Sequence, residues 1–119
     1  MARAALQDRH DIVRRRLQNQ GLLGKPFARP EQAVAWHLAV QSQDFAGAKW
    51  AIGQRCAGAS DESVEAAFSR GKLLRTHVLR PTWHFVVPAD VRFLLELSAP
   101  RIRGVIINLP RFPRESRSN

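Results

Sequence analysis

Apolar residues recur at helical spacing through most of the first 70 positions of the chain. Four stretches fit amphipathic helices, because their apolar side chains fall on one face of a repeat of about 3.6 residues. Start and stop signals agree with this division: Gly21 follows the first stretch, Pro30 opens the second, and Ser60 precedes the fourth. The sequence therefore predicts helices over residues 4–20, 30–40, 46–55 and 61–70.

A different pattern begins after the fourth helix. Residues 73–79 and 82–87 are rich in β-branched, aromatic and apolar side chains, and Arg80-Pro81 lies between them. Two such runs joined by a short turn are typical of a β-hairpin. Pro88 can then open a last helix over residues 90–98, which Pro100 is expected to end.

Three short helices, a hairpin and a further helix predict a mainly α chain with a β-hairpin, which belongs to the α+β class. This is the order of a winged helix, a variant of the helix-turn-helix, although other small α+β domains share it. We expect a basic N-terminal helix and linker (1–28), a winged-helix domain (29–103) and a basic tail with little order (104–119). The apolar positions of successive elements predict a core of Val34, Leu38, Trp50, Phe68, Leu74, Phe85, Leu94 and Leu97.

Charge points to a polyanionic partner, because 19 Lys and Arg residues against 10 Asp and Glu residues give a net charge of +9. The excess lies at the ends: residues 1–30 hold seven basic and two acidic residues, and residues 101–119 hold five and one. Arg14, Arg15 and Arg16 form the densest run. We expect it to bind DNA phosphates without sequence preference, and the alternative is a solvated helix face.

Other function classes are disfavoured by what the chain contains. Its apolar runs are far shorter than the roughly 20 residues that span a bilayer, and no apolar segment follows Arg3 as in a secretory signal. Cys56 is the only cysteine, which predicts a reducing, cytoplasmic location. We expect the chain to be nucleoid-associated there. His77 and His84 are too few for a zinc site, so we expect no metal and no cofactor, and His84 is predicted to contact DNA.

The segment Gln41-Ser42-Gln43-Asp44 stands out as two amides between two helical patterns. Asp44 suits the N-cap of the following helix, since its carboxylate can accept the free backbone N–H groups of the first turn. The pattern leaves open whether Gln41 and Gln43 act together. They face DNA in one interpretation and only hydrogen-bond loop backbone in the other.

Phosphate binding is predicted for the hairpin, not for the fourth helix. The basic residues in and around the hairpin have no acid between them: Arg70, Lys72, Arg75 and Arg80. The fourth helix begins instead with carboxylates that would meet DNA phosphates, namely Asp61, Glu62 and Glu65. In the alternative, Arg75 and Arg80 pair with carboxylates of neighbouring helices.

The stretches that carry a family resemblance are Gly71–Thr76, Leu79–Val86, Pro88–Arg92 and Leu97–Arg101. With Gln41-Ser42-Gln43 ahead of them, the chain resembles, over residues 9–103, the bacterial winged-helix DNA-binding domain proteins that include the AlkZ-like DNA glycosylases. The resemblance implies a monofunctional glycosylase that removes N7-alkylated purines or unhooks interstrand crosslinks, with Gln41 and Gln43 as its catalytic Gln-x-Gln motif. Ser42 departs from the usual aliphatic middle residue. The family proteins are much longer, so we expect a truncated relative that is inactive alone.

Amides suit this reaction better than other base excisions. A carboxamide is a poor base, but an N7-alkylguanine already carries a positive charge and leaves as a neutral molecule, so positioning a water can supply most of the help. The alternative function is a regulatory winged-helix module that binds DNA without chemistry. The acidic start of the fourth helix disfavours sequence-specific regulation.

Overall fold

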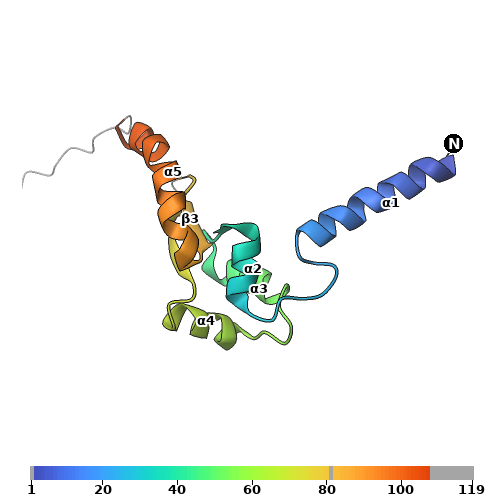
Figure 1. Ribbon diagram of the computed structural model, residues 1–119, viewed down its shortest axis with the longest axis horizontal. Coiled ribbons are helices and arrows are strands. Elements are labelled where there is room, and N and C mark those ends of the chain that lie inside the picture. Colours follow the sequence, from blue (N-terminus) through green and yellow to red (C-terminus); the bar gives the residue numbers. More distant parts are fainter. Residues whose placement is uncertain (1, 81, 108–119) are drawn as a thin grey trace, which may run out of the picture.

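Five helices and a three-stranded antiparallel sheet make up the part of the chain that the computed structural model describes, residues 2–80 and 82–107. Their order confirms the predicted α+β class and is consistent with a winged-helix-like fold (Figure 1). The elements are α1 (Ala2–Asn19), α2 (Pro30–His37), β1 (Val40–Gln41), α3 (Phe45–Gly53), α4 (Asp61–Ser69), β2 (Leu74–Val78), β3 (Thr82–Val86) and α5 (Pro88–Ile107).

Side-chain caps fix the starts of α3 and α4. The Asp44 carboxylate accepts a hydrogen bond from the Gly47 amide at 3.1 Å, as the sequence predicts. At α4 the capping is reciprocal: the Ser63 amide donates to Ser60 Oγ at 3.2 Å, and the Ser60 amide donates to Ser63 Oγ at 2.9 Å. These bonds satisfy amides that have no partner inside the helix, so each start is set locally by sequence.

The hairpin forms as predicted and gains a third strand. The strand order is β1-β3-β2, with Val40 opposite Phe85 and Gln41 opposite His84. Strand β1 is not predictable by period, because its two residues are strand only through their pairing with β3. The glutamine segment is therefore partly a sheet edge instead of a simple loop.

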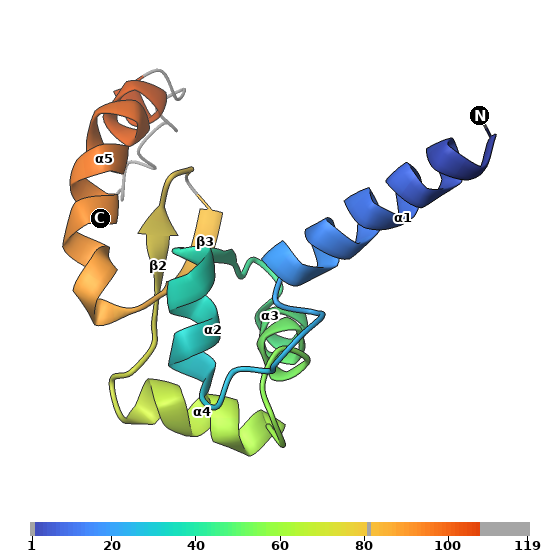
Figure 2. The ribbon, with the colours of Figure 1, turned by 45° about the vertical axis from the view of Figure 1, so that its right-hand side comes forward.

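The sheet lies between α5 on one side and α2, α3 and α4 on the other (Figure 2), and an apolar cluster fills each side. On one side, the rings of Phe45 and Phe68 pack against Phe85 with centroid distances of 5.7 and 4.8 Å, and helices α2, α3 and α4 complete the cluster. On the other side, Leu94 of α5 packs against strand residues Val78 and Val86. The sheet is thus held from both faces, which fixes the strand ends that carry the glutamines.

The predicted core is correct in its centre and wrong at its margins. Three of the predicted residues are fully buried, Val34, Phe85 and Leu94, while Phe68 and Leu74 are half-buried against the clusters. Leu38, Trp50 and Leu97 are 38%, 68% and 58% exposed. Helical spacing identifies an apolar face but not whether another element covers it, and Leu38 has left the helix with a φ of 65°.

Helix α1 projects away from the other elements (Figure 1). Its apolar stripe, Ile12, Val13 and Leu17, is exposed rather than packed. Its C-terminal end is tied to other elements: Trp36 Nε1 donates to the Asn19 carbonyl at 2.8 Å, and Arg55 Nε donates to the carbonyl of Gln20, just beyond the helix, at 2.7 Å. These donors satisfy carbonyl groups that the helix leaves without partners.

Helix α5 does not end at Pro100, as the sequence predicts, but continues to Ile107. The proline ring removes the N–H that the Glu96 carbonyl would accept. Both residues are exposed, so water can take its place. Residues 104–107, assigned to the tail by sequence, therefore continue this helix, and residues 108–119 lie outside the described part of the chain.

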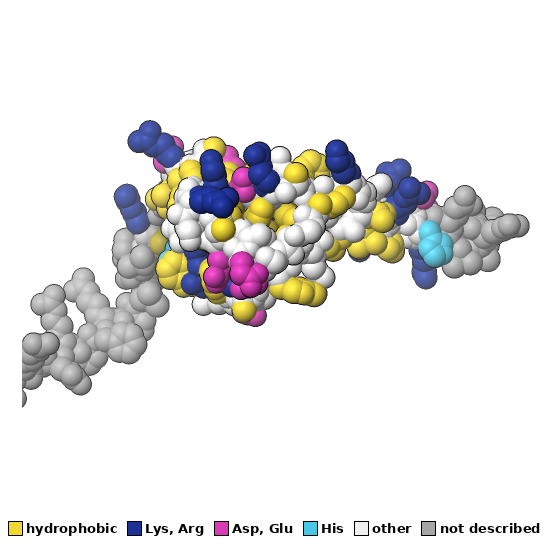
Figure 3. Space-filling model, turned by 90° about the horizontal axis from the view of Figure 1, so that it is seen from below, with side chains coloured by type: hydrophobic (Ala, Val, Ile, Leu, Met, Phe, Trp, Pro, Cys, Tyr) yellow, Lys and Arg dark blue, Asp and Glu magenta, His cyan; other side chains and the backbone are white. Residues whose placement is uncertain are grey.

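On the face shown in Figure 3, a group of acidic side chains lies below the centre, and Lys and Arg side chains lie along the upper margin with some acidic side chains among them. Lys49 joins α3 to α4, since its ammonium donates to Glu65 at 2.7 Å and to Asp61 at 2.9 Å. These two bonds raise the pKa of Lys49. Within the described residues, none of the helices is long and apolar enough to cross a membrane.

Candidate functional site

The Gln41-Ser42-Gln43 segment lies at the end of β1, beside the edge of β3. Exposure alternates along it: Gln41 and Gln43 are exposed, and Ser42 is fully buried. Burying the middle residue anchors the segment and leaves both carboxamides at the surface. The structure therefore places the two predicted catalytic residues where a ligand can reach them.

Strand β3 holds Gln43 through its side chain. The Ser42 amide donates to the Trp83 carbonyl at 2.7 Å. In a regular antiparallel pair, the Trp83 amide would donate back to the Ser42 carbonyl. Here it donates instead to Oε1 of Gln43, at 3.3 Å. One oxygen of the Gln-x-Gln pair thus replaces a main-chain acceptor, and this fixes the direction in which the Gln43 amide points.

Arg75 of β2 explains why the Ser42 carbonyl is not available to Trp83. Its Nη2 donates to the Ser42 carbonyl at 2.8 Å and its Nε donates to the same oxygen at 3.3 Å. A longer bond of 3.4 Å runs from Nη2 to the Gln43 carbonyl. The alternative prediction, that Arg75 pairs with carboxylates of neighbouring helices, is wrong. Its acceptors are main-chain carbonyls of the glutamine segment.

Aromatic rings hold the Arg75 guanidinium in place. Its Cζ lies 4.7 Å from the Trp83 ring centroid and 5.3 Å from that of Phe45. On Trp83 rests the ring of His77, with a centroid distance of 3.9 Å. The faces of both rings attract the positive charge of the guanidinium, and its planar shape lets it stack on them. Arg75 is therefore a fixed group, and its contacts reach the backbone of both Ser42 and Gln43.

Gln41 has a different neighbour, the buried His84. The two residues are opposite each other across β1 and β3, and Thr76 is opposite His84 on β2. His84 Nδ1 lies 2.9 Å from the Thr82 carbonyl, an acceptor only, so Nδ1 must carry a proton. In the neutral ring Nε2 is then an acceptor. DNA contact by His84 stays a prediction, and its small exposure of 8% limits it to an edge of the ring.

Ser42 carries a polar atom that the fold does not use. Its Oγ is buried without a hydrogen-bond partner among the described residues. Such a group loses its hydration without compensation. The position favours an apolar side chain, which matches the aliphatic residue that the resemblance implies there.

Apart from Arg75, the predicted phosphate-binding residues are dispersed over three places. Arg14, Arg15 and Arg16 lie exposed on the projecting α1, Lys72 lies in the turn after α4, and Arg80 lies in the turn of the hairpin. Arg80 shares its surroundings with Arg101 of α5. These residues do not converge on the glutamines, so their DNA contacts stay predictions that concern separate stretches of a ligand.

The remaining groups to consider are the metal-ligating side chains and Cys56. Residues 2–80 and 82–107 contain no cluster of three or more His, Cys, Asp or Glu side chains suited to a metal ion. Cys56 is buried, and burial raises the pKa of its thiol, with the Glu31 carboxylate adding to the effect and Arg55 opposing it. A thiol that stays protonated is a poor nucleophile.

Sequence reasoning missed Trp83 and the positioning role of Arg75. The period of the hairpin shows that Arg75 and Trp83 are strand residues, but not that β1 pairs with β3 and brings Ser42 beside them. A usable signal is that Arg75 and His77 are two residues apart on one strand and His77 is opposite Trp83 on the other, so that all three lie on one face of the hairpin.

Comparisons with known proteins relate this chain to DNA glycosylases. The sequence profile of the DNA glycosylase AlkZ-like family matches residues 34–115. The solved structure of Streptomyces sahachiroi DNA glycosylase AlkZ is 27% identical, with a TM-score of 0.63, over 69% of this chain and 22% of that chain. This chain thus spans about a fifth of the AlkZ length, and no curated protein matches it. The profile covers more than half of the chain, which therefore belongs to the AlkZ-like DNA glycosylase family.

Proposed function

We propose that this chain is the part of a monofunctional DNA glycosylase that positions the hydrolytic water on duplex DNA containing N7-alkylated purines. Family membership gives a role related to DNA repair. The observation that carries the finer proposal is the glutamine segment, which Arg75 and Trp83 hold rigidly while Gln41 and Gln43 stay exposed. Rigid presentation is what a water-positioning group requires.

The reaction needs little acid or base. A water oxygen attacks the sugar C1′, the electron pair of the C1′–N9 bond passes to the base and cancels its positive charge, and the water proton leaves to solvent. The products are an abasic site and a neutral alkylpurine. Because the leaving group is already activated, orientation of the water is the main contribution left to the protein.

The two amides divide this task. Gln43 Oε1 accepts the Trp83 N–H, which leaves its Nε2 hydrogens as donors toward a ligand. Gln41 offers its carbonyl oxygen as an acceptor for a water hydrogen. One donor and one acceptor on the same water fix both its place and its orientation, and neither amide needs to change its protonation state.

DNA binding by the basic residues belongs to the same proposal. Arg14 to Arg16, Lys72 and Arg80 would contact phosphates without reading sequence, since they lie apart on exposed surfaces. We propose residues 29–103 as the winged-helix unit and the bacterial cytoplasm, at the nucleoid, as the location. Because the chain spans 22% of AlkZ, excision is expected to need further protein around the DNA.

The test measures release of N7-methylguanine from methylated duplex DNA. A chimera in which this chain replaces the corresponding part of AlkZ supplies the rest of a cleft. Gln41→Ala and Gln43→Ala should each lower excision by about 100-fold and leave duplex affinity within about twofold, because the loss concerns orientation of the water. Gln54→Ala, which changes the exposed C-cap residue of α3, is the matched control and should excise normally. Full activity in the double glutamine variant would falsify the mechanism.

A second function, a DNA-binding module without chemistry, is favoured by one contact. Gln43 Oε1 already serves the Trp83 amide, which is what a purely structural glutamine does. In that case the chimera binds methylated and unmethylated duplexes equally and releases no base. Normal excision by the chimera, lost in the Gln41 variant, excludes this alternative.

A further inference from the structure

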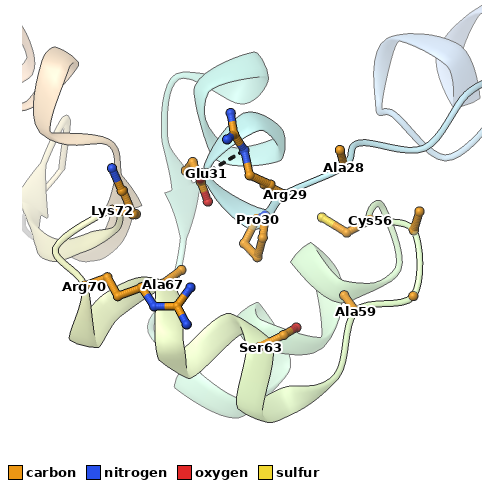
Figure 4. Close-up of a pocket in the computed structure, with 12 residues that line it drawn as sticks. Ala28, Arg29, Pro30, Glu31, Cys56, Ala59, Ser63, Ala67, Arg70 and Lys72 are labelled. Atoms are coloured by element: carbon orange, nitrogen blue, oxygen red, sulfur yellow. Dashed lines mark ion pairs between the residues drawn. The ribbon is translucent and has the colours of Figure 1, made fainter.

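A cavity of about 400 Å³ lies away from the glutamines, between the start of α2, the loop after α3 and the turn after α4 (Figure 4). Its walls carry mostly small or apolar side chains, with basic side chains at one end. The residues around it are Ala28, Arg29, Pro30, Glu31, Cys56, Ala57, Gly58, Ala59, Ser63, Ala67, Arg70 and Lys72.

Main-chain bonds make two of these walls rigid. Phe27 pairs with Cys56 in a parallel bridge, in which the Phe27 amide donates to the Arg55 carbonyl at 2.9 Å and the Ala57 amide donates to the Phe27 carbonyl at 2.8 Å. The turn after α4 is fixed by the Lys72 amide, which donates to the Ala67 carbonyl at 2.8 Å, and by Gly71 at a φ of 68°. The cavity is therefore a preformed feature of the fold.

The charge of the lining is positive. Arg29, Arg70 and Lys72 face a single carboxylate, Glu31, which pairs with Arg29 at 3.3 Å. Cys56 adds no negative charge, since burial raises the pKa of its thiol. Figure 4 shows Arg70 lying along α4 below Pro30, while Arg29 and Lys72 lie toward the α2 side. Among the described residues, neither Arg70 nor Lys72 takes part in an ion pair.

The charges on and after α4 favour DNA contact at its C-terminal end, beside the cavity. Its first turns carry Asp61, Glu62 and Glu65, which repel phosphates, and the basic residues follow its last turn. A DNA strand can therefore approach α4 with least repulsion at the end beside the cavity. The guanidinium fork of Arg70 suits a phosphate, which accepts paired hydrogen bonds.

We propose that this cavity binds a phosphate group of the DNA backbone between Arg70 on the α4 side and Lys72, with Arg29, on the α2 side. The proposal rests on the DNA binding proposed above and adds a specific anchor for it. Such a contact fixes the position of the duplex on the chain without reading bases, so it would set where the glutamines meet the strand. Free inorganic phosphate shares the same chemistry, and the test separates the two sources.

The first arm measures duplex affinity against salt concentration for the 119-residue chain and single variants. Arg70→Gln and Lys72→Gln should each flatten the slope of log K against log salt by about one unit, because each removes one phosphate contact. Arg92→Gln is the matched control: it removes the same charge from an exposed site on α5. An equal effect from Arg92→Gln would show that only net charge acts, and the cavity proposal fails.

The second arm follows the backbone amide NMR signals of Ala57, Gly71 and Lys72 during titration with inorganic phosphate or a short duplex. Shifts with both ligands, lost in Arg70→Gln, support the proposal. Shifts with phosphate and none with a bound duplex would overturn the DNA assignment. If no duplex binds at all, the proposed function fails, and the phosphate titration still decides whether the cavity holds an anion. Absence of any shift with phosphate overturns the site.

Discussion

The glutamine end of the sheet is held by contacts between residues far apart in the sequence, whereas helix α1 is formed mainly by neighbouring residues. Around Ser42, contacts join residues that are more than 30 positions apart, as in the bonds from Arg75 and to Trp83. Helix α1 is instead local: the apolar stripe of Val13 and Leu17 is exposed, and hydrogen bonds to Asn19 and Gln20 tie its C-terminal end to other elements. The sheet end is therefore specified by the whole domain, and α1 by its own residues.

A helix whose apolar face is exposed gains little from packing, and most helical stability in proteins comes from packing. We therefore expect substitutions at the sheet to act on the whole domain and substitutions on α1 to act locally. Each of the following predictions makes that difference measurable, from the largest effect to the smallest.

Removing a ring from the centre of the sheet should have the largest effect. Phe85 is fully buried between Phe45 and Phe68, so Phe85→Ala leaves a cavity and is expected to cost about 3–5 kcal/mol of unfolding free energy. Leu17→Ala on α1 should change it by less than about 0.5 kcal/mol. Urea unfolding followed by circular dichroism measures both, and equal losses would show that α1 is packed in solution.

Much of the fold was predictable from local signals. Ser60 and Asp44 are caps because of their own chemistry, and the hairpin follows from its composition. Strand β1 was not predictable, since two residues have no period of their own. Pro100 was expected to end α5. The hydrogen bond that it removes belongs to the exposed Glu96 carbonyl, which water can reach, so the helix continues.

The next prediction concerns the clamp on the glutamine segment. Arg75→Met removes charged hydrogen bonds to the Ser42 carbonyl and should cost about 1.5–3 kcal/mol. It should also speed hydrogen exchange at the Trp83 amide, whose partner Gln43 is no longer held. Hydrogen exchange followed by NMR gives the rate at that amide.

Arg80→Met is the control for this clamp, because it removes the same charge from the exposed hairpin turn. We expect little loss of stability and an unchanged Trp83 exchange rate. An Arg75 variant that exchanges no faster than the Arg80 variant would mean that Arg75 does not position Gln43, whatever the chain does to DNA.

The candidate site was predictable in its residue types but not in its supports. Gln41 and Gln43 are visible in sequence as two amides between helices, and the structure leaves both exposed. The groups that hold them, Arg75 and Trp83, act through strand pairing across a long separation in sequence. No local pattern encodes that pairing, so Arg75 appeared only as a charge available to phosphates.

The smallest predicted effect compares two buried serines. Hydrogen bonding alone decides whether replacing each one raises or lowers the unfolding free energy. Ser42 and Ser98 are both buried serines, but Ser98 Oγ accepts from the Leu79 amide at 2.6 Å and donates to the Leu94 carbonyl, while Ser42 Oγ has no partner among the described residues. Ser42→Ala removes an uncompensated polar atom and should raise the unfolding free energy by about 1 kcal/mol. Ser98→Ala leaves the Leu79 amide without its acceptor and should lower it by a similar amount. Thermal and urea unfolding of the two variants compare them directly. A loss of stability in Ser42→Ala would mean that its hydroxyl is bonded in solution, and that the sheet end is held by one more contact than Arg75 and Trp83 supply.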